Sequence, residues 1–266
     1  MHNIEFPNGE VIELDYDDVK HRYMVGDDVV PSVTRVVDGA FPKQGLIDWA
    51  VKSGADFFKA SVAQYQLGPE LDKDGVNRGM YMFPSSLVNH VYEGIVGAHK
   101  TISNEALDTG SLVHNWIEEA IKWKMGKGEA PEVPDDEAAV NCIEAFREWI
   151  KDLDVKWLAI EEKIYSKKYK YAGTVDAVAE INDELTVIDF KTSAKIYKPY
   201  HLQVAAYSQA ISEMYGKPVD RGLILRLDKD TGKFQTKTFD PNPHLEIFLL
   251  CMKLRQWSSD RIKNLK

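Results

Sequence analysis

The sequence predicts an α/β domain in which a mixed β-sheet is flanked by helices. Three strand-like segments follow one another at 155–165, 171–181 and 185–191. Two more strands are expected at 222–227 and 234–239. Helical patterns lie before, between and after these segments, at about 105–124, 135–152 and 199–215 and from about 242 onward. Strands bracketed by helices in this way are typical of the α/β class.

Apolar periodicity and turn residues define these elements. The helix at 105–124 has apolar residues at helical spacing, namely Leu112, Val113, Trp116, Ile117, Ala120 and Ile121. A proline-containing linker, 130–134, separates it from the helix at 135–152. The turn 228–232 joins the last two strands.

The first hundred residues are expected to add smaller elements. Short strands are predicted at 10–14 and 21–25, and a helix begins near Pro31-Ser32-Val33-Thr34, with Ser32 or Thr34 as its cap. Residues 45–66 are again helical in pattern. The segment 67–100 reads as a loop-rich insertion with a helix near 85–96, and it is either a lid over a site or a plain surface excursion.

Composition and charge restrict the class of protein. The formal net charge is 33 − 42 = −9, which argues against a protein that coats DNA through a basic surface. A local cationic track beside an acidic centre is still compatible with this charge, and lysines gather near the strands: Lys163, Lys167, Lys168, Lys170, Lys195 and Lys198. A solvated charged face is the alternative reading of each lysine.

The two cysteines and the N-terminus bear on the compartment. Cys142 and Cys251 lie far apart in apolar-periodic helices, so we expect core thiols and no iron–sulfur cluster or structural zinc. The N-terminal residues lack signal or transit character, and the sequence contains no apolar stretch of membrane-spanning length. A cytoplasmic protein that makes no membrane contact is therefore expected.

The most informative motif is Gly173-Thr174-Val175-Asp176, with Asp189-Phe190-Lys191 beginning thirteen positions after Asp176. Asn182-Asp183 suits a two-residue hairpin turn, and a four-residue loop, 181–184, is the alternative. Either loop pairs residues whose numbers sum to 365, which places Asp176 directly across from Asp189. A three-residue loop would put the two side chains on opposite faces of the sheet.

These residue types suit hydrolysis of a phosphodiester. Two opposed carboxylates repel each other, and a hard divalent cation turns that repulsion into binding. Lys191 follows Asp189 by two positions and so shares its face, where it can orient water and stabilise charge at phosphorus. An Asp-x-Lys tripeptide alone is common on surfaces. Here Val187 and Ile188 lead into it, and an apolar, interior strand is a costly place for unpaired charge.

Further polar residues could support this centre. His114 and Glu118 share one helical face, where the imidazole is a candidate metal ligand and a simple helix-edge pair is the alternative. Gln203 and Tyr207 are also four apart and could meet the lysine or a phosphate, or could simply pack. Glu161, on the preceding strand, would add a carboxylate, whereas Glu162 points the other way.

Taken in order, these blocks resemble the RecB-like branch of the PD-(D/E)XK nucleases. The blocks are Gly110 with His114 and Glu118, Gly-Thr-Val-Asp, Asp-Phe-Lys-Thr-Ser, and Gln203 with Tyr207. The Pro31-Ser32-Val33-Thr34 segment is similar to the mitochondrial genome maintenance exonucleases and related phage exonucleases. The resemblance covers about 29–210. It implies a restriction-endonuclease-like core and one nuclease domain over 1–266, with N-terminal elements and a possible lid in 1–100, the core at 101–240 and a C-terminal helix at 241–266.

The resemblance also implies roles for residues. His114, Asp176 and Asp189 would hold Mg²⁺, or Mn²⁺ in its place, and Lys191 would be the catalytic lysine with Gln203 and Tyr207 in support. Ser32, Thr34 and Lys195 are candidate DNA contacts, with helix capping as the alternative for the first two. The substrate would be single-stranded DNA or duplex ends, in phage-type recombination, repair or replication and with a protein partner from those processes. An endonuclease on the same core and an inactive DNA- or partner-binding module are the alternatives.

Overall fold

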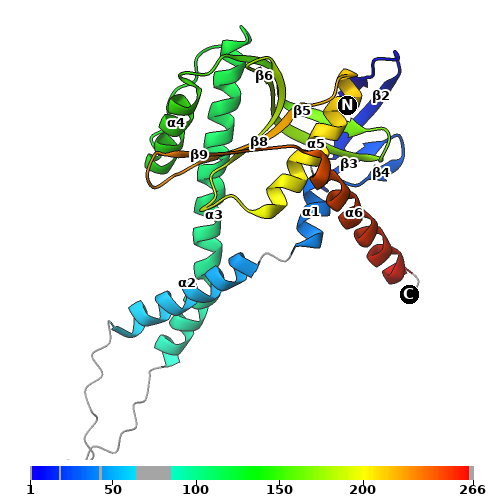
Figure 1. Cartoon of the computed structure of the whole chain (residues 1–266). Coiled ribbons are helices and arrows are strands. Elements are labelled where there is room, and N and C mark those ends of the chain that lie inside the picture. The colour runs from blue at the N-terminus through cyan, green and yellow to red at the C-terminus, as the bar shows by residue number, and fades with distance from the viewer. Residues whose placement is uncertain (1, 18, 42–43, 64–84, 264–266) are drawn as a thin grey trace, which may run out of the picture. The chain divides into compact units, whose positions relative to one another are not determined.

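Two β-sheets contain the strands of the described residues, which are 2–17, 19–41, 44–63 and 85–263 of this computed structural model. Internal contacts divide the chain into two compact units. One unit comprises Met1–Pro42 with Thr109–Lys266, and the other comprises Lys43–Asp108. Both sheets belong to the first unit (Figure 1).

The larger sheet has the strand order β5-β6-β7-β8-β9. β7 and β8 run parallel, and the other neighbours run antiparallel, so the predicted mixed sheet is confirmed. A parallel pair needs a crossover connection, which α5 (Lys198–Tyr215) provides. The strands are β5 (Val155–Ser166), β6 (Tyr171–Ile181), β7 (Glu184–Lys191), β8 (Arg221–Leu227) and β9 (Phe234–Phe239).

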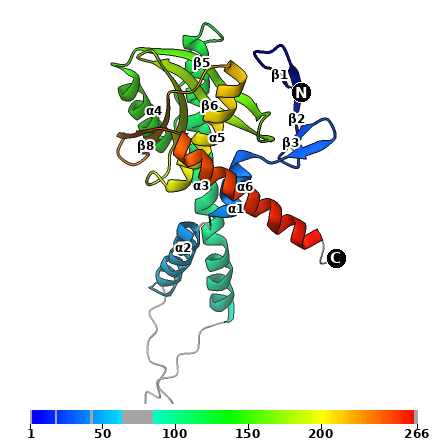
Figure 2. The ribbon, with the colours of Figure 1, turned by 45° about the vertical axis from the view of Figure 1, so that its right-hand side comes forward.

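Helices cover both faces of this sheet, and the side-chain alternation of β7 shows how. Leu185 and Val187 join a core formed with α1 (Val33–Ala40), α5 and α6 (Asn242–Lys263). Ile188 and Phe190 join a second core, formed with the C-terminal part of α3 (Ser85–Lys124) and with α4 (Glu137–Ile150). Figure 2 shows α4 and α5 on opposite sides of the sheet. Because both faces are covered, β7 is buried along nearly its whole length.

The N-terminal sheet is antiparallel, in the order β1 (His2–Glu5), β2 (Val11–Asp17), β3 (Arg22–Val25) and β4 (Asp28–Val30). The predicted strands at 10–14 and 21–25 correspond to β2 and β3. The prediction missed β1 and β4, which have four and three residues. A third apolar core joins this sheet to the start of β6, where the Ala172 amide donates to the Pro31 carbonyl at 2.9 Å.

The prediction of separate helices near 85–96 and 105–124 is wrong. The structure has one continuous helix, α3 (Ser85–Lys124). Glycines weaken the helical pattern in this stretch, yet a single glycine costs a helix only about 1 kcal/mol. Gly94 has a packing reason, because the Phe57 ring of α2 (Gln44–Ala63) occupies the space a Cβ would need. Residues 64–84, which include most of the predicted insertion and the end of the helix predicted at 45–66, lie outside the described residues.

The cysteines are free thiols, with Cys142 buried and Cys251 partly buried against a core. In the described part of the chain, no helix combines the length and the apolar character that crossing a bilayer requires.

Candidate active site

The candidate site lies where β6 and β7 separate. Their pairing runs from Ile181↔Glu184 to Ala177↔Ile188, and the paired numbers sum to 365 as predicted. Asn182 and Asp183 have φ values of 51° and 64°, which identifies the two-residue type I′ turn. Asp176 and Asp189 are the next residues on the two strands, just beyond the last pair.

Asp176 occupies this point of separation. The residue is only 9% exposed, and its Oδ2 accepts a hydrogen bond from the Phe190 amide at 2.8 Å. The same oxygen lies 3.9 Å from Nδ1 of His114, on α3. One carboxylate therefore connects the middle of β6 with the end of β7 and lies close to α3.

Asp189 and Lys191 form a buried ion pair beside it. The Lys191 Nζ donates to Asp189 Oδ1 at 2.6 Å. The other oxygen of Asp189, Oδ2, is buried and has no hydrogen-bond partner in the described part of the chain. A buried carboxylate oxygen of this kind is costly unless a donor or a cation engages it.

Burial and neighbouring charges set the protonation of this pair. Burial raises the pKa of Asp189, against the opposing effect of Lys191. Burial alone would lower the pKa of Lys191, but the carboxylates of Asp189 and Asp176 outweigh it, and the pKa is raised. Lys191 is therefore an ammonium at neutral pH, which suits a charge-stabilising group.

Glu161 completes a cluster of possible metal ligands. His114, Glu161 and Asp176 each offer one ligand atom, and these atoms lie within 4.8 Å of one another. On either side of Glu161, β5 pairs with β6 in a single register through Ile160↔Ala177 and Glu162↔Val175, which sets Glu161 beside Asp176. The cluster thus contains Glu161, expected as a supporting residue, whereas the set predicted from the sequence contained Asp189.

The surroundings of Glu161 concentrate negative charge. Burial, followed by the carboxylates of Asp176 and Glu118, raises the pKa of Glu161 to about 7. Its backbone φ of 48° is in the left-handed region, which is unusual for a non-glycine residue inside a strand. The next residue, Glu162, points away as predicted and accepts a hydrogen bond from the Tyr215 hydroxyl at 3.0 Å.

The predicted Gln203 and Tyr207 pair also lies at the site. Gln203 Nε2 donates to the Tyr207 hydroxyl oxygen at 3.0 Å. Burial and then the charges of Asp176 and Asp189 raise the pKa of Tyr207 well above its usual value, so the hydroxyl keeps its proton. Gly173 makes room for this ring, since a Cβ there would lie 2.8 Å from Tyr207 Cε1.

One residue of this helix face was not predicted. The Lys191 ammonium lies 5.0 Å from the ring centroid of Tyr200, a cation–π contact. Tyr200 is three residues before Gln203 and seven before Tyr207, so helical spacing could have identified it.

Four other predicted residues lie in different surroundings. Glu118 binds Lys122 at 2.5 Å on α3 and affects the site only through its charge. Ser32 is the N-cap of α1 and accepts from the Arg35 amide at 3.3 Å, which is the capping alternative. Thr34 is exposed. Lys195 is also exposed and lies 5.3 Å from the ring centroid of Tyr197.

The clustered residues fit a divalent cation. Carboxylate oxygens suit Mg²⁺ and Mn²⁺, and a neutral imidazole is a common ligand of transition metals. A cation would offset the burial and the carboxylate repulsion that raise the pKa of Glu161. The partnerless Oδ2 of Asp189 offers a further oxygen close by.

Comparison with known proteins relates part of the chain to nucleases. Residues 141–266 match the sequence model of the PD-(D/E)XK nuclease superfamily. The chain is 33% identical over 141 residues to mitochondrial genome maintenance exonuclease 1 of Xenopus tropicalis, a match that covers 49% of this chain and 39% of that protein. An alkaline exonuclease from Laribacter hongkongensis aligns in three dimensions at 12% identity and a TM-score of 0.28, covering 57% of this chain and 86% of the other. Residues 141–266 thus form a PD-(D/E)XK nuclease superfamily segment by their sequence.

Proposed function

We propose that this protein is a divalent-metal-dependent DNA exonuclease whose site is formed by His114, Glu161, Asp176, Asp189 and Lys191. One observation carries the proposal. The ligand atoms of His114, Glu161 and Asp176 lie within 4.8 Å of one another on a chain that matches a nuclease superfamily. The exonuclease name of the relative in Xenopus tropicalis favours action at ends.

The residues of the site have distinct roles in this proposal. His114, Glu161 and Asp176 would hold the cation, and Asp189 would add its unpartnered oxygen. When bound, a divalent cation neutralises phosphate oxygens and lowers the pKa of its water. Lys191, held by Asp189 and by the Tyr200 ring, places an ammonium where negative charge develops on the phosphate. Tyr207 and Gln203 close the buried side of the site and keep a hydroxyl dipole beside the two aspartates.

The finer features of the function are part of the same proposal. We expect Mg²⁺ as the physiological cation, with Mn²⁺ able to replace it. We expect the substrate to be single-stranded DNA or duplex ends, in phage-type recombination, repair or replication with a protein partner. The expected location is the cytoplasm of a bacterial or phage-infected cell.

Nucleotide release tests this proposal. The protein should release nucleotides from linear DNA with Mg²⁺ and not with excess chelator, and it should leave closed circular DNA intact. Lys191→Ala should lower the rate by more than a hundredfold, since a charge-stabilising donor contributes about that factor. Lys156→Ala is the matched control, because that lysine pairs with Glu180 on the surface.

The possible outcomes separate the alternatives. Cleavage of closed circles would identify an endonuclease. Equal activity of Lys191→Ala and the unmodified protein would overturn the site, and the absence of any metal-dependent cleavage would overturn the function.

A further inference from the structure

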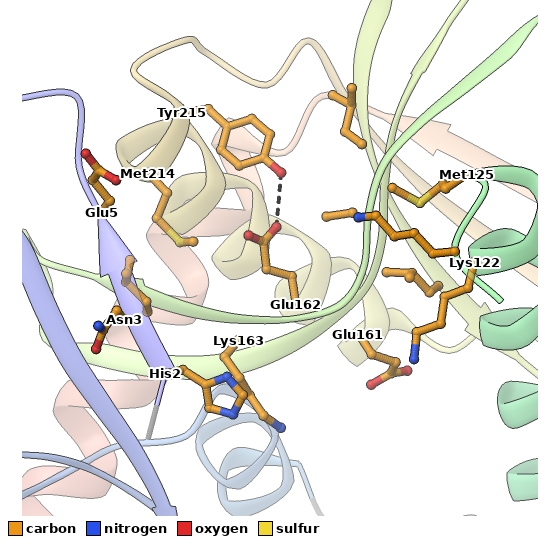
Figure 3. A pocket seen from close by; sticks show the side chains of 15 residues that line it. His2, Asn3, Glu5, Lys122, Met125, Glu161, Glu162, Lys163, Met214 and Tyr215 are labelled. Carbon is orange, nitrogen blue, oxygen red and sulfur yellow. Dashed lines mark hydrogen bonds between the residues drawn. The ribbon is translucent and has the colours of Figure 1, made fainter.

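A cavity of 530 Å³ runs along the outer edge of β5, and its wall includes Glu161 and Lys163. β5 is the edge strand of its sheet, so no strand of the described residues hydrogen-bonds to this side of it, and residues of β1 also line the cavity. Figure 3 shows Glu161 and Lys163 on one side of β5 and Glu162, bonded to Tyr215, on the other. The volume falls within the roughly 300–1,000 Å³ of small-ligand pockets. There is therefore room for a nucleotide beside the acidic cluster.

Neutral groups hold the Lys163 ammonium in place. Its Nζ donates to Thr174 Oγ1 at 2.9 Å, and the Tyr23 hydroxyl lies 2.7 Å from the same oxygen. Nζ also lies 5.0 Å from the ring centroid of Tyr16. No carboxylate in the described part of the chain comes within ion-pair distance of Lys163. Its ammonium is thus held in position by neutral groups, and Glu161 is a nearby carboxylate that its charge influences without a direct ion pair.

Lys163 lies close along β5 to the cluster of His114, Glu161 and Asp176. It follows Glu161 by two residues on β5, and its partner Thr174 precedes Asp176 by two on β6. Two residues of strand span roughly 6.5–7 Å. This step is similar to the separation of successive phosphates in an extended nucleic acid strand. A strand with one phosphate at the cluster can therefore present the next phosphate to Lys163.

Two tyrosine rings lie beside this position. The centroids of Tyr16 and Tyr23 are 4.7 Å apart at an interplanar angle of 45°. Tyr23 is buried, whereas Tyr16 is partly exposed. Lysines combined with aromatic faces are the usual means of binding single-stranded nucleic acid, because every base can stack.

We propose that Lys163 and Tyr16 form a subsite for the nucleotide adjacent to the scissile phosphodiester, with Lys163 on its phosphate and Tyr16 against its base. This inference rests on the proposed nuclease function and adds to it the nucleotide of the substrate that the protein binds. The subsite binds the strand and takes no part in the chemical step, so its loss should raise KM and leave kcat nearly unchanged.

A charge-removal cycle tests the phosphate contact. The first cleavage position is mapped on a single-stranded oligonucleotide. Two modified oligonucleotides are then made, each with a neutral methylphosphonate at one of the two linkages that flank the cleaved linkage. For one of the two linkages the unmodified protein should show a KM raised about tenfold, the effect of one hydrogen bond to a charged group. Lys163→Gln should show the same rise on the all-phosphate strand and no further rise with that methylphosphonate.

The controls separate this proposal from the nuclease function itself. Lys163→Arg should restore KM, and Lys156→Gln, at the far end of β5, should behave like the unmodified protein. If Lys163→Gln remains fully sensitive to both methylphosphonates, the subsite is overturned although the nuclease function stands. If the unmodified protein cleaves no substrate, the nuclease function has failed.

An abasic nucleotide tests the base contact in the same way. Tyr16→Ala should raise KM several-fold on intact DNA and should add nothing on a strand that is abasic at that nucleotide. Tyr16→Phe keeps the ring and should match the unmodified protein. An equal effect of Tyr16→Ala on intact and abasic strands would remove Tyr16 from the subsite.

Discussion

The Asp176 carboxylate accepts a hydrogen bond from the Phe190 amide at 2.8 Å, one residue beyond the point where β6 and β7 stop pairing. The carboxylate therefore satisfies a buried amide that the ladder no longer pairs. The same side chain belongs to the cluster with His114 and Glu161. Asp176 thus has a structural and a metal-binding role, and substitution can separate them.

Asp176→Asn should keep the fold and lose the activity. The amide oxygen can still accept from Phe190, but it carries no charge to bind a cation. We expect the free energy of unfolding to change by less than ~1 kcal/mol and cleavage to fall more than a hundredfold. Asp176→Ala leaves the Phe190 amide unpaired and should cost about 1–3 kcal/mol as well. Urea denaturation measures both variants, and equal stability of the two would contradict the structural role.

The register of β6 and β7 could be predicted because a local signal sets it. Asn182 and Asp183 tolerate the positive φ of a type I′ turn, and that turn determines every pair up to Ala177↔Ile188. Glu161 is different. Its position depends on a register shift between Trp157 and Ala159, a bulge with no clear sequence pattern. The metal ligands predicted from the sequence were therefore His114, Asp176 and Asp189, whereas the structure clusters Glu161 with His114 and Asp176.

Lys191→Met should destabilise the protein as well as inactivate it. The substitution leaves the buried carboxylate of Asp189 without its ammonium, and breaking a buried ion pair costs about 3–5 kcal/mol. Adding Asp189→Asn removes the unpaired charge. The double variant should then recover part of the lost stability in urea denaturation while staying inactive. A single variant as stable as the unmodified protein would show that this ion pair contributes little to folding.

Gly173→Ala should lower the stability of the protein, because the added methyl group would crowd two side chains next to the site. Its Cβ would lie 2.8 Å from Tyr207 Cε1 and 3.3 Å from Val33 Cγ2, and both of these side chains are buried. Overpacking of this kind typically costs about 1–3 kcal/mol. Gly110→Ala is the matched control, because its Cβ would meet Thr192 Oγ1 at an ordinary 3.4 Å and alanine favours a helix. Thermal melting should rank Gly173→Ala well below Gly110→Ala.

Stabilisation by Mg²⁺ should depend on pH through Glu161. Burial, then the charges of Asp176 and Glu118, raises the pKa of this carboxyl to about 7, so protonation competes with cation binding below that pH. Without a cation, the raised pKa means that the folded state binds more protons than the unfolded state. Stability should therefore fall as pH rises from about 4.5, the ordinary value, to about 7.

A cation reverses that trend because it binds the deprotonated form. At a fixed Mg²⁺ concentration, the rise in melting temperature should be several degrees larger at pH 8 than at pH 6, since ligand stabilisation grows with affinity. Glu161→Gln has no proton to exchange at this position, so its rise in melting temperature should be smaller and should differ less between the two pH values, the remaining difference coming from groups such as Asp189. Melting curves with Mg²⁺ and with chelator at both pH values give this comparison. A pH effect of unchanged size in Glu161→Gln would assign the titration to another group of the site.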